Sequence, residues 1–266
     1  MSNGAGRVAG KVALITGGGT SIGRAIAVRL VQKGADVVVT SRTPEHVEET
    51  CDRVVGQVAD RFGRIDVLSN NAGIELPHGP SVAETTDEEW EQLFRVNVTG
   101  AFYACRAALA FMPDGGSIVN MASINSFVAW ENDDAYTATK GALLQFTRAL
   151  ALEVAARGIR ANCVCPGVVD TPLTDLFLAG ADDPDALRAE YEAVSPFHRM
   201  GTPEEVANCV LFLASDEASF VTGARDDRRR RDDGQIGQTK SGSRRRFGTS
   251  IASTITSKSL SVSKYA

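Results

Sequence analysis

The chain has 266 residues, of which 43% are hydrophobic and 23% are charged, and its formal net charge is −5. This length and composition suffice for one substantial core in a single α/β domain. No apolar run is long enough to span a membrane, and the first residues, MSNGAGRVAGK, lack the hydrophobic stretch of a signal peptide. We therefore expect a soluble, cytoplasmic protein.

Cysteine spacing and charge distribution narrow the class of protein further. The cysteines are odd in number and contain no CxxC pair, which predicts buried free thiols and no metal site. They are Cys51, Cys105, Cys163, Cys165 and Cys209. Residues 224–266 hold eleven Lys plus Arg and four Asp plus Glu, so this tail is basic, and the rest of the chain is acidic.

The N-terminal region predicts a strand (Val12–Thr16), a glycine-rich turn (Gly17–Gly23), a helix (Ile22–Lys33) and a second strand (Asp36–Thr40). A unit of this kind opens a parallel sheet. It binds a dinucleotide pyrophosphate against backbone N–H groups at the positive end of the helix. The turn alone is a weak signal, but here the required strand precedes it and the required helix follows it.

The residues after the second strand bear on the choice of cofactor. An acidic side chain at this place accepts hydrogen bonds from the ribose 2′-hydroxyl of NAD, whereas arginine pairs with the 2′-phosphate of NADP. The chain has Ser41 and Arg42 here, which favours NADP(H). NAD(H) stays open, because Arg42 is alternatively a solvated loop residue.

The middle of the chain continues the pattern of helices and strands. Residues 43–65 have room for one helix before a strand at Asp66–Ser69. Thr86 and Glu89 form a capping box that opens a long helix, in which Asn97 interrupts the apolar pattern. A buried strand then ends near Ser123, at the edge of the sheet where ligands of parallel sheets bind.

Tyr136 and Lys140 lie four residues apart in an alanine- and leucine-rich helix, Ala135–Arg157. One helical turn places both side chains on the same face. A free phenol has a pKa of about 10, and a nearby cation lowers that value by favouring phenolate. Tyr136 is thus a candidate general acid or base. The alternative is a half-buried tyrosine beside a solvated lysine, with Ser123 merely capping a loop.

The C-terminal third predicts a strand that ends at Pro166–Gly167, followed by a segment with several apolar residues between Pro172 and Met200. A second capping box, Thr202 with Glu205, opens a helix that runs to about Ala214.

In order and at similar spacing, these motifs resemble those of the short-chain dehydrogenase/reductase family, from about Gly10 to Gly223. The resemblance is carried by Thr16–Gly17 through Gly23, Asn70-Asn71-Ala72-Gly73, Asn97, Ser123, Tyr136, Lys140, and Pro166-Gly167 followed by Thr171. It implies a Rossmann-like, doubly wound parallel sheet. It also implies an oxidoreductase that transfers a hydride between NADP(H) or NAD(H) and a secondary alcohol or ketone.

The resemblance assigns a role to each of four catalytic residues. Tyr136 exchanges the hydroxyl proton and Ser123 orients the substrate oxygen. Lys140 lowers the phenol pKa and holds the nicotinamide ribose, and Asn97 positions a water of a proton relay. The expected cofactor contacts are Gly17, Thr20, Ser21, Ile22, Gly23, Ser41, Arg42, Asn71, Ala72, Gly73, Tyr136, Lys140, Pro166, Gly167, Val169 and Thr171.

The chain also departs from the family pattern. Members usually have a helix, a third strand and another helix where this chain has residues 43–65. Its second strand should therefore lie at a sheet edge, with a weakened adenine pocket. Ser21 stands where the family usually has glycine. The final strand is also expected to be absent after Gly223.

The basic residues 224–266 cannot bury an apolar strand, and we expect them to be disordered. Three interpretations compete: a replaced terminus, a solvated appendage, or a binder of nucleic acid or membrane lipid, which the scarcity of aromatic residues disfavours. An inactive, cofactor-binding variant that acts through assembly or through this tail is the alternative to an active enzyme. Because the family assembles through two long helices and the final strand, a dimer is expected before a tetramer.

Overall fold

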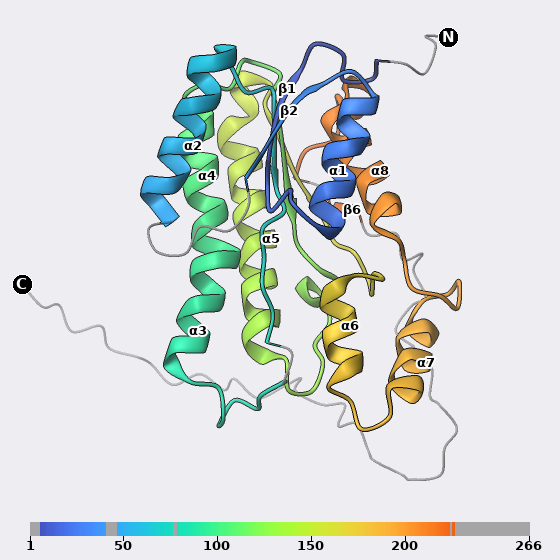
Figure 1. Ribbon diagram of the computed structural model, residues 1–266. Helices are drawn as coiled ribbons and strands as arrows, with labels where there is room; N and C mark the ends of the chain where they lie inside the picture. Colours follow the sequence, from blue (N-terminus) through green and yellow to red (C-terminus); the bar gives the residue numbers. More distant parts are fainter. Residues whose placement is uncertain (1–5, 41–46, 77–78, 224, 227–266) are drawn as a thin grey trace, which may run out of the picture. The chain divides into compact units, whose positions relative to one another are not determined.

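The computed structural model describes residues 6–40, 47–76, 79–223 and 225–226. Its strands form one parallel sheet in the order β2-β1-β3-β4-β5-β6 (Figure 1). The strands are β1 (Val12–Thr16), β2 (Asp36–Thr40), β3 (Val67–Asn70), β4 (Ser117–Met121), β5 (Arg160–Val164) and β6 (Arg225–Asp226). The predicted Rossmann-like, doubly wound parallel sheet is confirmed.

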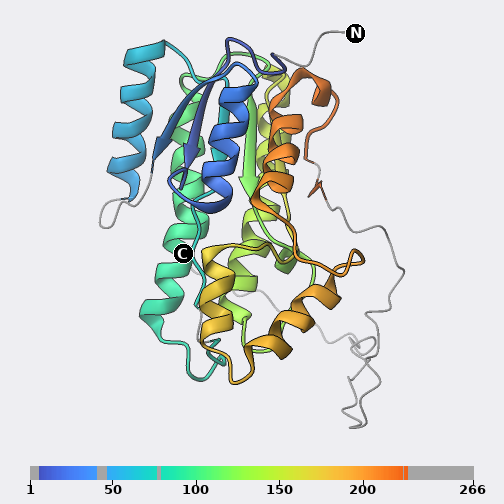
Figure 2. The same cartoon turned by 45° about the vertical axis from the view of Figure 1, so that its right-hand side comes forward.

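Helices cover both faces of this sheet (Figures 1 and 2). They are α1 (Ser21–Gln32), α2 (Val47–Phe62), α3 (Asp87–Phe94), α4 (Gly100–Leu109), α5 (Asp134–Val154), α6 (Pro172–Ala179), α7 (Pro184–Val194) and α8 (Pro203–Ala214). Both predicted capping boxes are present, at Thr86 and at Thr202. None of the helices in the described part of the chain has the length and apolar character that crossing a membrane requires.

Alternation along the strands builds two separate cores. In β1, Ala13 and Ile15 pack with α1 and α8, while Val12 and Leu14 pack with α2, α4 and α5. Because successive side chains of a strand point to opposite faces, a strand that is apolar throughout is buried on both sides. This arrangement leaves the carboxyl ends of the strands open, and α6 and α7 lie beyond those ends (Figure 2).

The strand β2 lies at one edge of the sheet, as predicted. Within the described residues it pairs only with β1, and α2 is the one helix between β2 and β3. Its Val39 side chain is 47% exposed. No additional strand between β2 and β3 covers this edge in the part of the chain that the structure describes.

We expected no final strand after Gly223, and this expectation is wrong: two residues form one, β6. Arg225 and Asp226 pair in parallel with Cys163 and Val164 of β5. Gly223 adopts a φ of +65°, and its N–H donates to the Ala161 carbonyl over 2.8 Å, which directs the chain along β5. Such a short strand forms through backbone hydrogen bonds and needs no apolar side chains. Residues 227–266, where most of the predicted disordered tail falls, lie outside the described residues.

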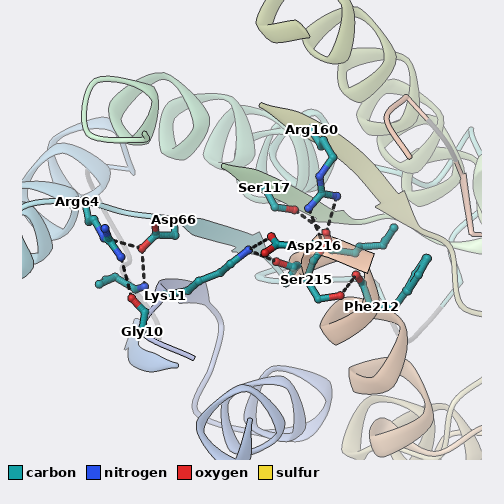
Figure 3. A network of polar contacts seen from close by, with 12 residues as sticks. Gly10, Lys11, Arg64, Asp66, Ser117, Arg160, Phe212, Ser215 and Asp216 are labelled. Atoms are coloured by element: carbon teal, nitrogen blue, oxygen red, sulfur yellow. Dashed lines mark hydrogen bonds and ion pairs between the residues drawn. The ribbon is translucent and has the colours of Figure 1, made fainter. Parts of the chain in front are cut away.

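Polar contacts fasten the amino ends of the strands to the end of α8 (Figure 3). Arg160 donates to the Leu213 carbonyl over 2.7 Å and to the Ser215 carbonyl over 3.2 Å. Lys11 donates to the Ala214 carbonyl over 3.2 Å. The last carbonyls of a helix lack intrahelical partners and carry negative partial charge, so cations stabilise them. The last turn of α8 and its polar contacts thus cover the amino end of the sheet, which is opposite the carboxyl end.

Candidate active site

Ser123 stands just beyond the carboxyl end of β4, at the start of a short 3-10 helix, η2 (Ile124–Ser126). Its backbone is extended, and its hydroxyl oxygen accepts a hydrogen bond from the Asn125 N–H over 3.2 Å. The predicted strand therefore delivers Ser123 to the expected edge of the sheet. The serine also caps the short helix η2, as the alternative interpretation of the sequence proposed.

Tyr136 and Lys140 lie one turn apart near the start of α5 and share a site with Ser123. The Lys140 Nζ lies 5.3 Å from the centre of the Tyr136 ring and donates to the Met121 carbonyl over 3.1 Å. The Tyr136 hydroxyl and the Ser123 side chain are hydrogen-bonded. The structure therefore gathers three of the four predicted catalytic residues around the end of β4.

The electrostatics of this group differ from the expectation. Burial raises the pKa of Tyr136 well above its usual value, the Glu75 carboxylate raises it further, and the hydrogen bond from Ser123 acts in the opposite direction. Burial also lowers the pKa of Lys140 to about 8. The predicted lowering of the phenol pKa is therefore wrong in its direction, because desolvation of the phenolate has the largest effect on it.

Asn97 lies in a π-helical segment, Arg95–Thr99, which joins α3 to α4 inside the stretch that the sequence predicts as one long helix. Its buried amide donates to the Ile74 carbonyl over 2.9 Å and accepts from the Ile74 N–H over 2.8 Å. It also donates to the Thr139 hydroxyl over 3.1 Å. Asn97 thus fastens the segment after β3 to the helix that carries Tyr136 and Lys140. A Cβ on Gly73 would lie 3.3 Å from both Asn97 Oδ1 and Lys140 Nζ, so this segment passes directly against the ammonium.

The glycine-rich turn is packed against the loop that follows β3. Gly17 has a φ of +67°, and a Cβ on Gly23 would lie 2.1 Å from the Gly17 carbonyl oxygen. The Asn71 side chain donates to that carbonyl over 3.2 Å. Thr16, which the expected cofactor contacts do not include, accepts from the backbone N–H groups of Asn71 and Ala72, both over 3.1 Å. The turn can therefore keep this close geometry only with glycine at positions 17 and 23.

The start of α1 suits an anionic group such as a dinucleotide pyrophosphate. Its N-cap residue, Thr20, makes no side-chain capping bond, and its first turn contains no acidic residue. The first turns of α3, α6, α7 and α8 each have a capping side chain and an acidic residue. The N–H groups of α1 are thus left for a ligand, which is the chemistry that a phosphate needs. Ser21, the first residue of α1, has a φ of +50°, in the left-handed region that favours glycine.

Of the other predicted cofactor contacts, Ile22 lies in the first turn of α1, four residues lie between β5 and the start of α6, and two fall elsewhere. The Pro166 carbonyl accepts from the Ile124 N–H over 2.8 Å, and a Cβ on Gly167 would meet open space. Val169 is buried, and Thr171 caps α6 by accepting from the Thr174 N–H. Ser41 and Arg42 lie outside the described residues, so the preference for NADP over NAD that they predict stays a prediction from the sequence.

Three further side chains face the site, and the sequence patterns did not reveal them. Glu75 follows Ile74 in the segment that Asn97 fastens, and its carboxylate interacts with Lys140, Tyr136 and Asp133. Burial raises the pKa of Glu75 to about 8 and that of Asp133 to about 7. Burial raises the pKa of Tyr191 of α7 and both carboxylates raise it further, so α7 lies within electrostatic range of the site. The position of Asp133, three residues before Tyr136, was the only local signal for any of them.

Comparisons with known proteins agree with this geometry. Residues 11–53 match the family described as short chain dehydrogenase, and residues 46–225 match the one described as enoyl-(acyl carrier protein) reductase. The two matches meet within α2, where the sequence indicates a shortened connection. The chain is 39% identical over 241 residues to 2-(R)-hydroxypropyl-CoM dehydrogenase of Xanthobacter autotrophicus, covering 80% of this chain and 95% of that protein.

Two other similar proteins come from different organisms. General stress protein 39 of Bacillus subtilis is 35% identical over 244 residues, covering 83% of each chain. The structure of Thermoplasma acidophilum aldohexose dehydrogenase in ligand-free form has a TM-score of 0.77 and 33% identity, and the match covers 84% of this chain and 93% of that one.

A parallel sheet with a glycine-rich first turn and a serine, tyrosine and lysine beyond its strand ends defines a dinucleotide-dependent α/β oxidoreductase. The chain belongs to the short-chain dehydrogenase/reductase family. It is accordingly a dehydrogenase or reductase, and its family and fold imply a nicotinamide dinucleotide cofactor.

Proposed function

We propose that this protein catalyses reversible hydride transfer between a nicotinamide dinucleotide and a small secondary alcohol or its ketone. The observation that carries the proposal is the grouping of Ser123, Tyr136 and Lys140 at the carboxyl end of β4, beside the glycine-rich turn. A bound nicotinamide supplies or accepts the hydride. The protein's own part is to bind the alcohol and to move the proton of its hydroxyl group.

The roles in this reaction follow from the contacts. Tyr136 gives the proton to the carbonyl oxygen or takes it from the alcohol, and Ser123 orients that oxygen by a hydrogen bond. Lys140 holds the nicotinamide ribose and stabilises the phenolate once it forms. Asn97 keeps the segment after β3 against Lys140, so it supports the site through Ile74 and Thr139.

Two cofactors fit the sequence, and we propose NADP(H) before NAD(H). Ser41 and Arg42 support this order, because a guanidinium pairs with a 2′-phosphate and no acidic residue is present at these two positions to accept from a 2′-hydroxyl. The edge position of β2 favours weak binding of the adenine end for either dinucleotide.

The carboxyl groups around Tyr136 favour a substrate rich in hydroxyl groups. Glu75 and Asp133 both face the site, and none of the hydrogen bonds or ion pairs among the described residues involves the Glu75 carboxylate. It is therefore open to accept hydrogen bonds from a hydroxyl next to the reacting carbon. The similarity to an aldohexose dehydrogenase supports a polyhydroxylated alcohol of sugar size.

A dimer is the proposed assembly. Phe102 of α4 is 41% exposed and Leu152 of α5 is 83% exposed, although both lie on long helices that are otherwise well packed. Covering these apolar side chains with a second copy would remove them from water. Light scattering coupled to gel filtration tests this proposal.

A second candidate function is a cofactor-binding protein without turnover, which the uncovered edge at β2 favours. Titration with NADPH and with NADH, followed by nicotinamide fluorescence, separates binding from catalysis. Turnover is then measured with D-glucose, D-mannose, glycerol and 2-propanol, each with NADP⁺ and with NAD⁺. Saturable binding with turnover supports the enzyme, and binding without turnover of any alcohol would favour the second function. Absence of both binding and turnover would contradict both functions.

A further inference from the structure

Besides the Tyr136 hydroxyl, the Ser123 hydroxyl contacts Asn125, through both the backbone N–H and the side-chain amide of that residue. The Asn125 N–H donates to Ser123 Oγ over 3.2 Å, and Ser123 Oγ donates to Asn125 Oδ1 over 3.3 Å. Asn125 itself is only 7% exposed. The place of the Ser123 hydroxyl therefore depends on where the Asn125 amide is held.

Two acceptors on α5 hold that amide. The Asn125 NH₂ group donates to the Asp133 carboxylate and, over 3.3 Å, to the Thr137 hydroxyl oxygen. A carboxylate only accepts hydrogen bonds, so the amide nitrogen must face Asp133 and the amide oxygen must face Ser123. The hydrogen bonds thus run in one direction, from Ser123 through Asn125 to Asp133.

Asp133 makes this contact in place of its usual local one. It is the N-cap residue of α5, where aspartate commonly accepts from the N–H groups of the first turn, yet its side chain makes no capping bond. The 3-10 helix η2 is fastened to α5 a second time, because Ser126 Oγ donates to the Lys140 carbonyl over 2.8 Å. These hydrogen bonds therefore hold the loop that carries Ser123 against the helix that carries Tyr136 and Lys140.

We propose that Asp133, acting through the amide of Asn125, is a positioning residue that sets the place of the Ser123 hydroxyl. The inference rests on the proposed hydride-transfer function. Without the carboxylate, the amide loses the acceptor that holds it in place, and the loop loses one of its contacts with α5. Ser123 then meets the substrate oxygen from an altered position, while the glycine-rich turn is unaffected.

The test compares full-length variants with a matched neighbour. Asp133→Ala removes the acceptor, Asp133→Asn keeps an acceptor oxygen without the charge, and Asp134→Ala removes the same charge one residue along α5. We expect Asp133→Ala to lower kcat on the order of 10- to 100-fold, with cofactor affinity and melting temperature like those of Asp134→Ala. Asp133→Asn should recover most of the loss. Equal kcat values for Asp133→Ala and Asp134→Ala would overturn the proposal.

A double-mutant cycle tests whether the effect passes through Asn125. In an Asn125→Ser background, Asp133→Ala should cost little further kcat, because the two side chains act as one unit. An undiminished loss in that background would mean that Asp133 acts directly on the site, against the proposal.

A measurement without turnover separates this inference from the proposed function. The side-chain ¹⁵N–¹H resonances of Asn125, assigned by their loss in Asn125→Ser, should shift in Asp133→Ala and stay in place in Asp134→Ala. Unchanged resonances in Asp133→Ala would refute the hydrogen-bonded chain whatever the activity. Shifted resonances in a protein that turns over none of the four alcohols would retain the chain, refute its catalytic role, and count against the proposed function itself.

Discussion

The ammonium nitrogen of Lys140 lies 5.3 Å from the centre of the Tyr136 ring, and burial lowers its pKa to about 8. A buried cation next to a neutral phenol is costly for the fold, and it is useful only if the phenol has to become phenolate. The buried Lys140 ammonium thus lowers the stability of the fold, and it lies where the proposed reaction needs a positive charge.

Replacing Lys140 with methionine should raise stability and lower activity. The folded protein binds fewer protons than the unfolded chain between pH 8 and the ordinary lysine pKa of 10.5. Wild-type stability therefore rises with pH in that window. Lys140→Met does not titrate, so we expect it to be more stable than wild type by about 1–2 kcal/mol at pH 7, with a difference that shrinks toward pH 10. Urea unfolding at several pH values measures this difference, and a constant difference would contradict the assignment.

Glu75→Gln should show the opposite dependence on pH. The pKa of Glu75 is raised from 4.5 to about 8, so the folded protein binds more protons than the unfolded chain between these values, and wild-type stability falls as pH rises through them. The glutamine variant should match wild type near pH 4.5 and exceed its stability by on the order of 2 kcal/mol at pH 9. Glu153→Gln, an exposed change on α5, serves as the control. If both variants follow the same curve, Glu75 does not face a buried site.

Ser21→Gly should relieve backbone strain at the start of α1. A serine at a φ of +50° costs about 1 kcal/mol relative to glycine, and the greater freedom of glycine in the unfolded chain takes back about half of that gain. We expect a stabilisation of a few tenths of a kcal/mol up to about 1 kcal/mol, and no gain for Ser21→Ala, which keeps the strain. Chemical unfolding distinguishes the two variants. Equal stabilities would show that residue 21 is not strained in solution.

Gly23 and Gly56 form a matched pair for testing the dinucleotide turn. Gly23→Ala would place a Cβ 2.1 Å from the Gly17 carbonyl oxygen, whereas Gly56→Ala in α2 meets nothing within 4 Å. We expect the first change to destabilise by about 1–3 kcal/mol and to abolish dinucleotide binding, and the second to stabilise by about 0.5–1 kcal/mol. Calorimetry and NADPH titration report both effects. Normal NADPH affinity in Gly23→Ala would argue against this turn as the binding site.

Local patterns predicted the elements of this fold well, because those patterns are set by neighbouring residues. The strands β1 and β2 begin and end at the predicted residues, and both capping boxes were visible in the sequence. The long helix around Asn97 was also predicted, but its π-helical segment was not, and there Asn97 donates to the carbonyl of Ile74, 23 residues away.

The electrostatic character of the site was harder to foresee. Glu75 and Tyr136 come from segments that only the folded sheet brings together, so no spacing in the sequence revealed the acidic surroundings of the phenol. The depth of burial, which reverses the predicted direction of the Tyr136 pKa shift, also arises only from tertiary packing. Short-range features such as the YxxxK spacing located the site, and long-range packing set its chemistry.

The proton-transfer role of Tyr136 is tested most directly by Tyr136→Phe, measured with the best alcohol of the panel and with Tyr103→Phe as the control. Removing the one hydroxyl should lower kcat by at least about 1,000-fold, while NADPH affinity stays within about twofold of wild type. The control variant should keep wild-type kcat. A Tyr136→Phe protein that turns over the alcohol as fast as Tyr103→Phe would contradict the proposed mechanism.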